Sequence, residues 1–303
     1  MRQAEKVLGG VLAPVTTPFD PVSGELAVTA FRANVRAHVD AGVTGIVVSG
    51  STGEAPLLEE EERRRLVELA RAVVPDDCWV VAGVGAESTR LTVRRALEAA
   101  ERGADALLVV APHYFGAAMT ADALGVHFRR IADRSPVPVI LYNIPKYAHF
   151  RLEPSLVAEL SRHENIVGIK DSSGDLGLLT AYVTSQREDF TILTGNGGSF
   201  FPALEIGARG GILAVSLFAG PLSVGLYRAF VGGDRVRATR AQQRLTPLAA
   251  EIVGSLGVAG VKAAMDEVGL AGGPVRPPLL PLGAAERARV TELLQAADIA
   301  RAA

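Results

Sequence analysis

One lysine of this chain occupies a position that suits covalent chemistry. Lysine and arginine together number 31, and only Lys6, Lys146, Lys170 and Lys262 are lysines. Lys170 ends the apolar run that begins at Ile166, which reads as a buried strand. A neutral amine can attack a carbonyl carbon, whereas a guanidinium stays charged, so lysine at this position favours a nucleophile. The alternative is a strand-end lysine whose tip reaches solvent, and this stretch alone leaves both interpretations open.

A tyrosine ends another apolar run, in the sequence YNIP from Tyr142 to Pro145. Side chains alternate along a strand, so Tyr142 points inward if Leu141 faces the helices. A phenol at that position can carry protons for a reaction. The alternative is a core aromatic residue whose hydroxyl bonds a backbone group.

The sequence GSTGE, from Gly50 to Glu54, follows a third apolar run. Glycines allow backbone N–H groups to converge on an anion, and the hydroxyls of Ser51 and Thr52 add donors. The same residues also suit an ordinary turn in which Glu54 caps the next helix.

Two further loops follow predicted strands. Tyr114 lies in the sequence PHYF and offers a second phenol, although its loop is uninformative by itself. The sequence GNGG, from Gly195 to Gly198, suits phosphate binding, but a turn that lines a pocket is the favoured interpretation. We include Gly195, and Leu213 in the eighth predicted strand, among the substrate-binding candidates.

Other classes of function lack the residues they need. The histidines show no metal-binding spacing, so we expect no metal site, and neither a GxSxG nor a phosphate-loop motif occurs. A net charge of −2 gives no reason to expect binding to nucleic acid or an anionic membrane. One cysteine, an N-terminus without the apolar core of a signal peptide, and apolar runs too short to span a bilayer predict a cytoplasmic protein. The histidines are His38, His113, His127, His149 and His163.

Short apolar runs alternate with segments of helical spacing along most of the chain. Runs that are apolar on both faces and separated by helices predict parallel strands closed into a (β/α)₈ barrel. A doubly wound open sheet is the alternative, but the residues after the first strand, Val15 to Pro18, form no glycine-rich dinucleotide turn. The predicted strands are Gly10 to Val15, Gly45 to Ser49, Trp79 to Val84, Ala106 to Ala111, Val137 to Tyr142, Ile166 to Lys170, Thr191 to Thr194 and Gly211 to Val215.

The residues after the eighth strand exceed what a barrel requires. Pro221 to Val231 suits the eighth helix, and three further helices predict an appended bundle: Asp234 to Val253, Ala259 to Val268 and Ala284 to Ala302. We therefore predict a barrel domain over residues 1–232 and a helical extension over residues 233–303. Among the earlier helices, we expect Leu57 to Val73, Thr89 to Arg102 and Ala121 to Arg134.

Taken together, GSTGE, YNIP and GIKDSSGD resemble the motifs of the dihydrodipicolinate synthase/N-acetylneuraminate lyase family, in the same order and at similar spacing. The resemblance covers nearly the whole chain, including the connector GGPVRPPL in the extension. It implies a class I aldolase that handles pyruvate through a lysine imine, without a metal or other cofactor.

The resemblance also implies a role for each matched residue. Lys170 corresponds to the lysine that forms the imine, and Tyr142 to the phenol that moves protons at the reacting centre. Ser51 and Thr52 correspond to the pair that holds the keto acid's carboxylate. Tyr114 corresponds to a tyrosine that enters a neighbouring subunit's site and completes a hydroxyl relay with Ser51 and Tyr142. That last role implies a homodimer, usually doubled to a homotetramer.

The second substrate is an aldehyde whose identity depends on two departures from the family's motifs. Synthases of the family carry an arginine where this chain has Tyr147, beside Lys146, and sialic acid lyases carry acidic residues where this chain has GNGG. The PHYF stretch, the TGNGG loop and the tail GVAGVKAAMDEVGLAGGPVRPPL most resemble those of 4-hydroxy-2-oxoglutarate aldolases and related 2-keto acid aldolases. We therefore expect cleavage or formation of a 4-hydroxy-2-oxo acid. Dihydrodipicolinate synthesis from pyruvate and aspartate semialdehyde is the alternative, and a non-catalytic keto-acid-binding paralogue is the second alternative.

Overall fold

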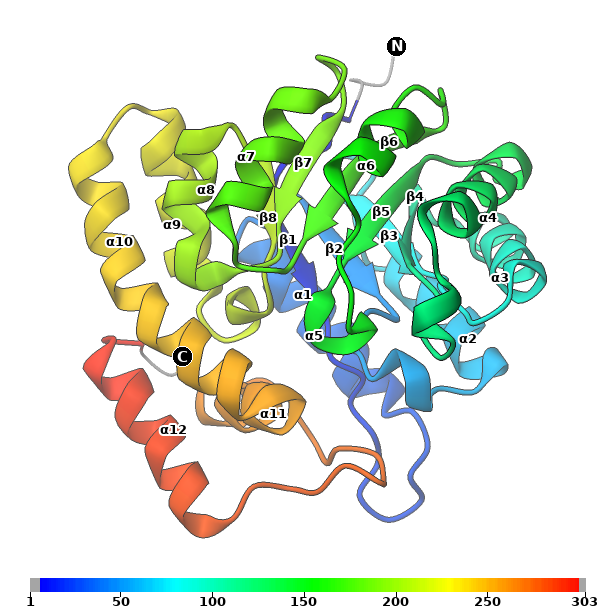
Figure 1. Cartoon of the computed structure of the whole chain (residues 1–303). Coiled ribbons are helices and arrows are strands. Elements are labelled where there is room, and N and C mark those ends of the chain that lie inside the picture. Colours follow the sequence, from blue (N-terminus) through cyan, green and yellow to red (C-terminus); the bar gives the residue numbers. More distant parts are fainter. Residues whose placement is uncertain (1–5, 300–303) are drawn as a thin grey trace.

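Eight parallel strands form a closed barrel in a computed structural model that describes residues 6–299 (Figure 1). The strands follow one another around the barrel in chain order, and β8 pairs with β1. The predicted (β/α)₈ barrel is confirmed. The strands are β1 (Gly10–Pro14), β2 (Gly45–Val48), β3 (Trp79–Gly83), β4 (Ala106–Val110), β5 (Val139–Asn143), β6 (Ile166–Asp171), β7 (Thr191–Thr194) and β8 (Gly210–Ile212).

Helices cover the barrel and continue beyond it. The α-helices are α1 (Val28–Asp40), α2 (Glu60–Arg71), α3 (Thr89–Glu101), α4 (Ala121–Arg134), α5 (Pro145–Ala148), α6 (Pro154–Leu160), α7 (Leu176–Ser185), α8 (Phe200–Ile206), α9 (Gly220–Val231), α10 (Arg235–Pro247), α11 (Gly257–Glu267) and α12 (Ala284–Ala296). The other helical segments are η1 (Ala55–Leu57), η2 (Gly116–Ala118), η3 (Gly197–Ser199), η4 (Ala214–Leu217) and the π-helix η5 (Leu248–Ser255).

The strands separate two apolar layers, because alternate side chains point to opposite faces. Leu12, Val47, Leu108 and Ile140 pack inside the barrel, while neighbours such as Leu141 pack against the surrounding helices. Both layers are buried, which explains why the strands read as continuous apolar runs. The inner layer fills the barrel and leaves its carboxyl-end rim for polar side chains.

Two strands run one residue further than the sequence predicted. Strand β5 ends at Asn143 and β6 at Asp171, because these two residues are paired in the register and the Asn143 Nδ2 donates to Asp171 Oδ1 at 2.7 Å. Strand β8 is shorter than the predicted run Gly211 to Val215. The Ser216 hydroxyl donates to the Leu213 carbonyl at 2.7 Å, which turns the chain into η4.

The first helix of the extension differs from its prediction. The expected single helix Asp234 to Val253 is an α-helix as far as Pro247 and then a π-helix. Proline lacks an N–H and disturbs the preceding turn, so it accounts for this change of helical type. The last helix ends at Ala296 rather than Ala302, and residues 300–302 of that prediction lie outside the described residues.

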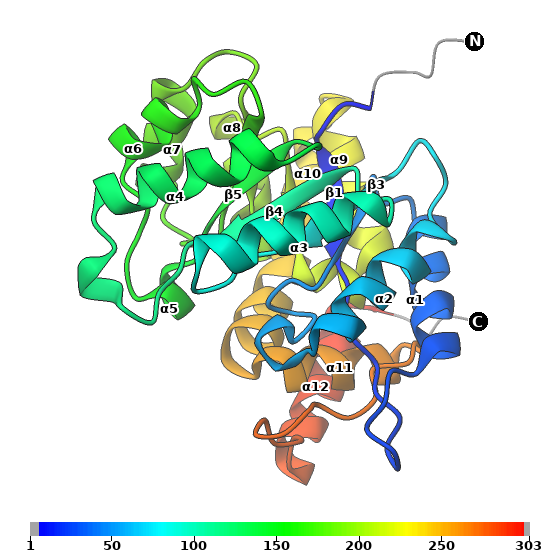
Figure 2. The ribbon, with the colours of Figure 1, turned by 90° about the vertical axis from the view of Figure 1, so that its right-hand side faces the viewer.

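The extension lies at one end of the barrel. In Figures 1 and 2, α11 and α12 lie at the lower end of the molecule, on the same side as α5, which directly follows β5. The carboxyl ends of the strands therefore face the extension. The division into a barrel and an extension at residue 232 stays a prediction. Among residues 6–299, no helix has the length and apolar character needed to cross a membrane.

Two buried histidines should make the folded protein less stable at acid pH. Burial lowers the pKa of His38 and of His127 from 6.5 to about 4. Between pH 6.5 and 4 the unfolded chain therefore binds more protons than the folded one, so the free energy of unfolding should fall as the pH falls. Each histidine should account for up to about 3 kcal/mol.

Urea unfolding at pH 7, 5.5 and 4.5 tests this expectation. His38→Gln removes one titrating group, so the loss of stability between pH 6.5 and 4 should shrink relative to that of the unsubstituted protein. His149→Asn is the control, because His149 is exposed and asparagine tolerates its left-handed backbone conformation. An identical pH dependence in His38→Gln and the unsubstituted protein would contradict the prediction.

Candidate active site

A cavity of about 470 Å³ lies where the carboxyl ends of the strands meet the extension. Its lining includes Tyr142 and Lys170 near the ends of β5 and β6, and Ser51 and Thr52 from the turn after β2. The remaining lining combines strand-end loops with residues of η5 and α11. These other residues are Pro14, Ile144, Lys146, Tyr147, Ser172, Ser173, Gly195, Asn196, Gly197, Ile212, Ala214, Val215, Ala249, Val253, Gly254, Gly257, Val258 and Val261.

Lys170 and Tyr142 are neighbours on adjacent strands. The register pairs Tyr142 directly with Lys170, and the Lys170 Nζ lies 4.2 Å from the centroid of the tyrosine ring. Tyr142 belongs to the inner apolar layer and Leu141 to the outer one, so the expected inward orientation is confirmed. Within residues 6–299, neither the Lys170 Nζ nor the Tyr142 hydroxyl has a protein hydrogen-bond partner. Both groups are thus available to a molecule in the cavity.

Gly195 leaves the space that the lysine side chain occupies. A Cβ at this position would lie 2.9 Å from the Lys170 Cε and would overlap the Ser172 hydroxyl. The Gly195 amide donates to the Asp171 carbonyl at 2.6 Å, which holds the loop against β6. The requirement for glycine here is steric, and it supports the assignment of the GNGG sequence as a pocket-lining turn.

A polar network behind the strand ends holds β5 and β6 in place. The Asp171 carboxylate accepts hydrogen bonds from Asn143 and from the Ser173 hydroxyl, the latter at 2.7 Å. Asn143 Oδ1 in turn accepts from the Leu152 amide at 2.9 Å. Burial raises the pKa of Asp171, and its hydrogen bonds to Ser173 and Asn143 oppose that shift. Asp171 directly follows Lys170 and is held by these hydrogen bonds, so the Lys170 amine extends from a rigid strand end.

The turn that follows β2 exposes two backbone donors. Within residues 6–299, the amides of Ser51 and Thr52 donate to no protein acceptor, whereas the next two amides close the turn by donating to Gly50 and Ser51. Ser49 and Glu54 flank the turn in left-handed conformations, with φ values of 52° and 57°. Each such residue costs on the order of 1–2 kcal/mol, so the surrounding structure must hold the turn in this shape.

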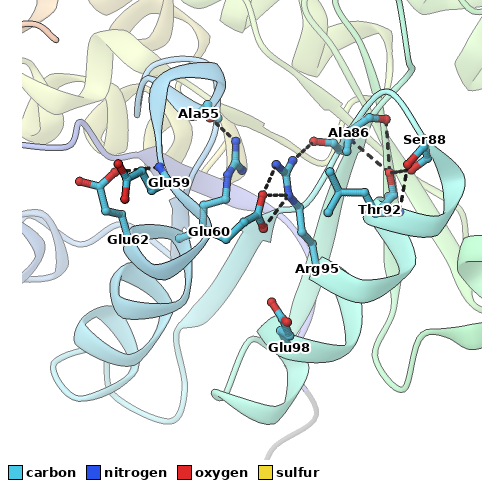
Figure 3. A network of polar contacts seen from close by, with 12 residues as sticks. Ala55, Glu59, Glu60, Glu62, Ala86, Ser88, Thr92, Arg95 and Glu98 are labelled. Atoms are coloured by element: carbon cyan, nitrogen blue, oxygen red, sulfur yellow. Dashed lines mark hydrogen bonds and ion pairs between the residues drawn. The ribbon is translucent and has the colours of Figure 1, made fainter.

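Helices α2 and α3 support this turn from outside the barrel. Arg63 donates to the Ala55 carbonyl just beyond the turn, and Arg95 holds Glu60 through a contact of 2.6 Å while donating to the Gly85 carbonyl at 2.7 Å (Figure 3). Charge-assisted bonds of this kind are stronger than neutral ones. The β2 and β3 loops are therefore fastened to each other behind the cavity wall.

The cavity lining also contains Lys146 and Tyr147 from α5. The Lys146 Nζ donates to the Gly254 carbonyl at 2.8 Å, which ties the α5 turn to the π-helix. Tyr147 is 43% exposed, and burial of the rest of its side chain raises the pKa of the phenol, so it is a neutral donor at pH 7. Among the described residues that line the cavity, Lys146 and Lys170 supply the cationic side chains and arginine is absent.

Two of the predicted site residues lie outside the cavity lining. Tyr114 is 79% exposed and packs edge-to-face on Phe115, with ring centroids 5.0 Å apart. Leu213 is fully buried in the outer apolar layer, and only its neighbours Ile212 and Ala214 line the cavity, so any contact of Leu213 with substrate has to involve its main chain. The roles of both residues stay predictions.

The contribution of the extension was missed from the sequence. Ala249, Val253, Val258 and Val261 line the cavity, although they follow β8 by more than thirty residues. Their apolar character indicated only that the segment is buried. Ser172 and Ser173 were also missed, and their place two and three residues after Lys170 in GIKDSSGD was a usable signal. Among the described residues, no cluster of histidine, cysteine or acidic side chains is arranged to hold a metal ion.

Comparison with known proteins assigns the chain to a family. The model of the dihydrodipicolinate synthetase family matches residues 7–297. The chain belongs to this family. It is 36% identical to a 4-hydroxy-tetrahydrodipicolinate synthase of Methanosphaerula palustris, over 95% of this chain and 99% of that protein. It is 39% identical to an uncharacterized DapA-like lyase of Halobacterium salinarum, over 93% of this chain and 91% of that protein.

A solved structure of the same family agrees with the fold. YagE, a prophage protein of E. coli K12 described as a dihydrodipicolinic acid synthase family member in complex with pyruvate, superposes with a TM-score of 0.92. The two proteins are 30% identical, and the match covers 97% of this chain and 99% of YagE. Members of the dihydrodipicolinate synthetase family are Schiff-base-forming, pyruvate-dependent lyases, and this chain is a carbon–carbon lyase of that class.

Substitution of the cavity phenol should separate proton transfer from binding. Tyr142→Phe removes one hydroxyl and little volume, so the KM for a keto acid should change little. The turnover number should fall by about 10²-fold or more, which is the usual scale for a lost general acid or base. Steady-state kinetics give both values. A rise in KM with an unchanged turnover number would instead assign Tyr142 to substrate positioning.

Proposed function

We propose that this protein is a class I aldolase in which Lys170 forms an imine with pyruvate. The observation that carries the proposal is the placement of the Lys170 amine 4.2 Å from the Tyr142 ring centroid, in a cavity that also contains the Ser51–Thr52 turn. A nucleophile, a proton carrier and an anion-binding turn therefore share one cavity. These three groups are what imine chemistry on a 2-keto acid needs.

The chemistry follows from the electron demand of a protonated imine. The Lys170 amine attacks the keto carbon, Tyr142 gives its proton to the oxygen that leaves as water, and a protonated imine forms. The protonated imine then accepts the electron pair of the bond between C3 and C4 of the keto acid, while the Tyr142 phenolate takes the proton of the C4 hydroxyl and an aldehyde departs. The resulting enamine is protonated at C3, and water releases pyruvate from Lys170. The reverse sequence forms the carbon–carbon bond.

The carboxylate of the keto acid fits the turn after β2. The unengaged amides of Ser51 and Thr52 and their hydroxyls supply donors on one side of the cavity, and charge-assisted hydrogen bonds to a carboxylate are strong. Gly195 and the main chain near Leu213 complete the binding side in this proposal. No cofactor takes part, because the imine itself accepts the electrons.

Tyr114 is proposed to act in a second copy of the chain. It is exposed together with Phe115, beside a loop whose amides at His113 and Tyr114 donate to Glu87 at 3.0 and 2.9 Å. A well-anchored loop that presents two aromatic side chains to solvent suits insertion into a partner subunit. We therefore propose a homodimer or homotetramer, and the cytoplasm as its compartment.

The aldehyde is proposed to be that of a 4-hydroxy-2-oxo acid. The observation that supports this choice is the absence of arginine among the described residues that line the cavity, which include Tyr147. An arginine grips a carboxylate with two parallel hydrogen bonds, whereas a phenol donates one.

Dihydrodipicolinate synthesis is the second candidate, and the names of the relatives favour it. The Methanosphaerula palustris relative is a 4-hydroxy-tetrahydrodipicolinate synthase and matches along nearly the whole chain. Lys146 offers a charge that can replace the arginine if it leaves the Gly254 carbonyl. A non-catalytic keto-acid-binding role is disfavoured, because Lys170 and Tyr142 both line the cavity and neither side chain has a hydrogen-bond partner in the part of the chain that the structure describes.

Borohydride trapping tests the nucleophile. Pyruvate plus borohydride should add one reduced pyruvate-derived group to the protein, and peptide mapping should place it on Lys170 rather than on Lys6, Lys146 or Lys262. Lys170→Arg keeps the charge but cannot form the imine, so both trapping and turnover should disappear while the fold is retained. Turnover that survives in Lys170→Arg would refute the imine mechanism.

Kinetics with two substrates test the aldehyde. A charge-assisted contact contributes about 1.5–3 kcal/mol, or roughly 10- to 150-fold in affinity. Cleavage of a 4-hydroxy-2-oxo acid should therefore be efficient, and dihydrodipicolinate synthesis weak. Tyr147→Arg supplies a guanidinium that can donate two hydrogen bonds to the carboxylate, so it should raise the rate of dihydrodipicolinate synthesis.

Lys146→Met identifies the alternative donor. Efficient synthesis by the unsubstituted protein that is lost in Lys146→Met would assign the carboxylate to Lys146 and would overturn the 4-hydroxy-2-oxo acid assignment. Efficient synthesis that persists in Lys146→Met would also overturn it, and would place the carboxylate on other donors.

A further inference from the structure

A buried ion pair joins the extension to the turn after β2. Lys262 lies on α11 and Glu54 ends the turn, and the Lys262 Nζ lies 2.5 Å from Glu54 Oε1. Their side chains are 2% and 0% exposed. A buried charge is costly unless its remaining hydrogen-bonding groups are also satisfied, so a pair in this position has stringent geometric requirements.

The hydrogen bonds around Lys262 meet those requirements. Its Nζ donates to the Thr17 carbonyl at 2.8 Å and to the Pro274 carbonyl at 2.6 Å, and it lies 4.6 Å from the centroid of the Phe19 ring. The ammonium is thus held by the chain after β1, by the connector of the extension and by Glu54. Burial lowers the pKa of Lys262, and the Glu54 carboxylate opposes that shift.

Glu54 is held on its second oxygen as well. The Arg276 amide, in the connector before α12, donates to Glu54 Oε2 at 2.7 Å. Two segments that follow β8 therefore contact this carboxylate of the turn after β2: the Arg276 amide donates to it, and Lys262 forms an ion pair with it. These contacts fasten Glu54 in the left-handed conformation that closes the turn.

A neighbouring contact fastens the same turn from β1. The Thr17 hydroxyl donates to the Gly53 carbonyl at 2.7 Å, and the Thr17 carbonyl accepts from Lys262. Gly53 itself has little freedom, because a Cβ there would lie 2.9 Å from the Val15 carbonyl oxygen. Thr17, Gly53, Glu54 and Lys262 thus form one connected set directly behind the amides of Ser51 and Thr52.

We propose that Lys262 and Glu54 are positioning residues for the keto acid, which hold the Ser51–Thr52 turn in the shape that binds a carboxylate. The inference rests on the proposed function, because it takes that turn as the carboxylate site. It assigns a task to the extension: α11 lines the cavity with Val258 and Val261 and also sets the geometry of the anion-binding turn through Lys262. Neither charge touches the substrate.

The test measures the pyruvate concentration that gives half-maximal borohydride trapping, by mass spectrometry of the intact protein. Lys262→Met and Glu54→Gln each break the pair, so this concentration should rise by about 10-fold or more, the scale of one lost charge-assisted hydrogen bond. The fraction trapped at saturating pyruvate should stay the same, because Lys170 is unchanged. A purely structural pair would lower the melting temperature without moving the half-saturation point.

Two milder variants keep the test decisive if a single substitution prevents folding. Glu54→Gln/Lys262→Met removes both charges and leaves no unpaired buried ion, which proteins often tolerate. Thr17→Val removes only the hydroxyl that supports Gly53.

Asp105→Asn is the control, because Asp105 pairs with Lys6 and Arg71 at 2.9 and 3.1 Å before β4, at the opposite end of the barrel. It should lower stability and leave half-saturation unchanged.

The outcomes are distinct. A higher half-saturation point in the pair variants and in Thr17→Val, but not in Asp105→Asn, supports the inference. Equal half-saturation points in all folded variants overturn it and leave the proposed function intact. An unsubstituted protein that traps no pyruvate on Lys170 refutes the proposed function, and with it the positioning role that depends on that function.

Discussion

The pairing of β5 with β6 is the constraint on which the rest of the site depends. Backbone hydrogen bonds of the closed barrel set Tyr142 opposite Lys170, and a shift of either strand by one residue would turn that strand's side chain toward the helices. The Asn143–Asp171 bond locks this register at the strand ends. Because the register is held by the barrel as a whole, the amine and the phenol meet without any loop having to close.

Three further parts of the chain complete the site around Tyr142 and Lys170. Gly195 leaves space for the lysine, the Ser51–Thr52 turn contributes free amides, and residues of α11 form the outer wall. Two left-handed residues, Ser49 and Glu54, carry the strain of the turn. A strained backbone conformation persists only where surrounding contacts hold it in place. The ion pair between Glu54 and Lys262 is one of these contacts.

The extension is part of this design. It supplies apolar wall residues, the π-helix that bonds Lys146 through Gly254, and the cation that holds the turn after β2. Membership of the dihydrodipicolinate synthetase family establishes the class of chemistry, and the proposed choice of aldehyde rests on the side of the cavity formed by Lys146 and Tyr147. In this chain that side combines a phenol, a lysine and apolar residues.

The sequence by itself determined the barrel, the position of Lys170 near a strand end and the inward direction of Tyr142, because period-two alternation and doubly buried runs are local properties. The resemblance of three motifs added the expected chemistry. Only the tertiary structure decided which distant segments share the cavity. Val258 and Val261 reach the cavity, and Lys262 meets Glu54, only because of how α11 packs on the barrel mouth. Packing of that kind leaves no periodic signal in the chain.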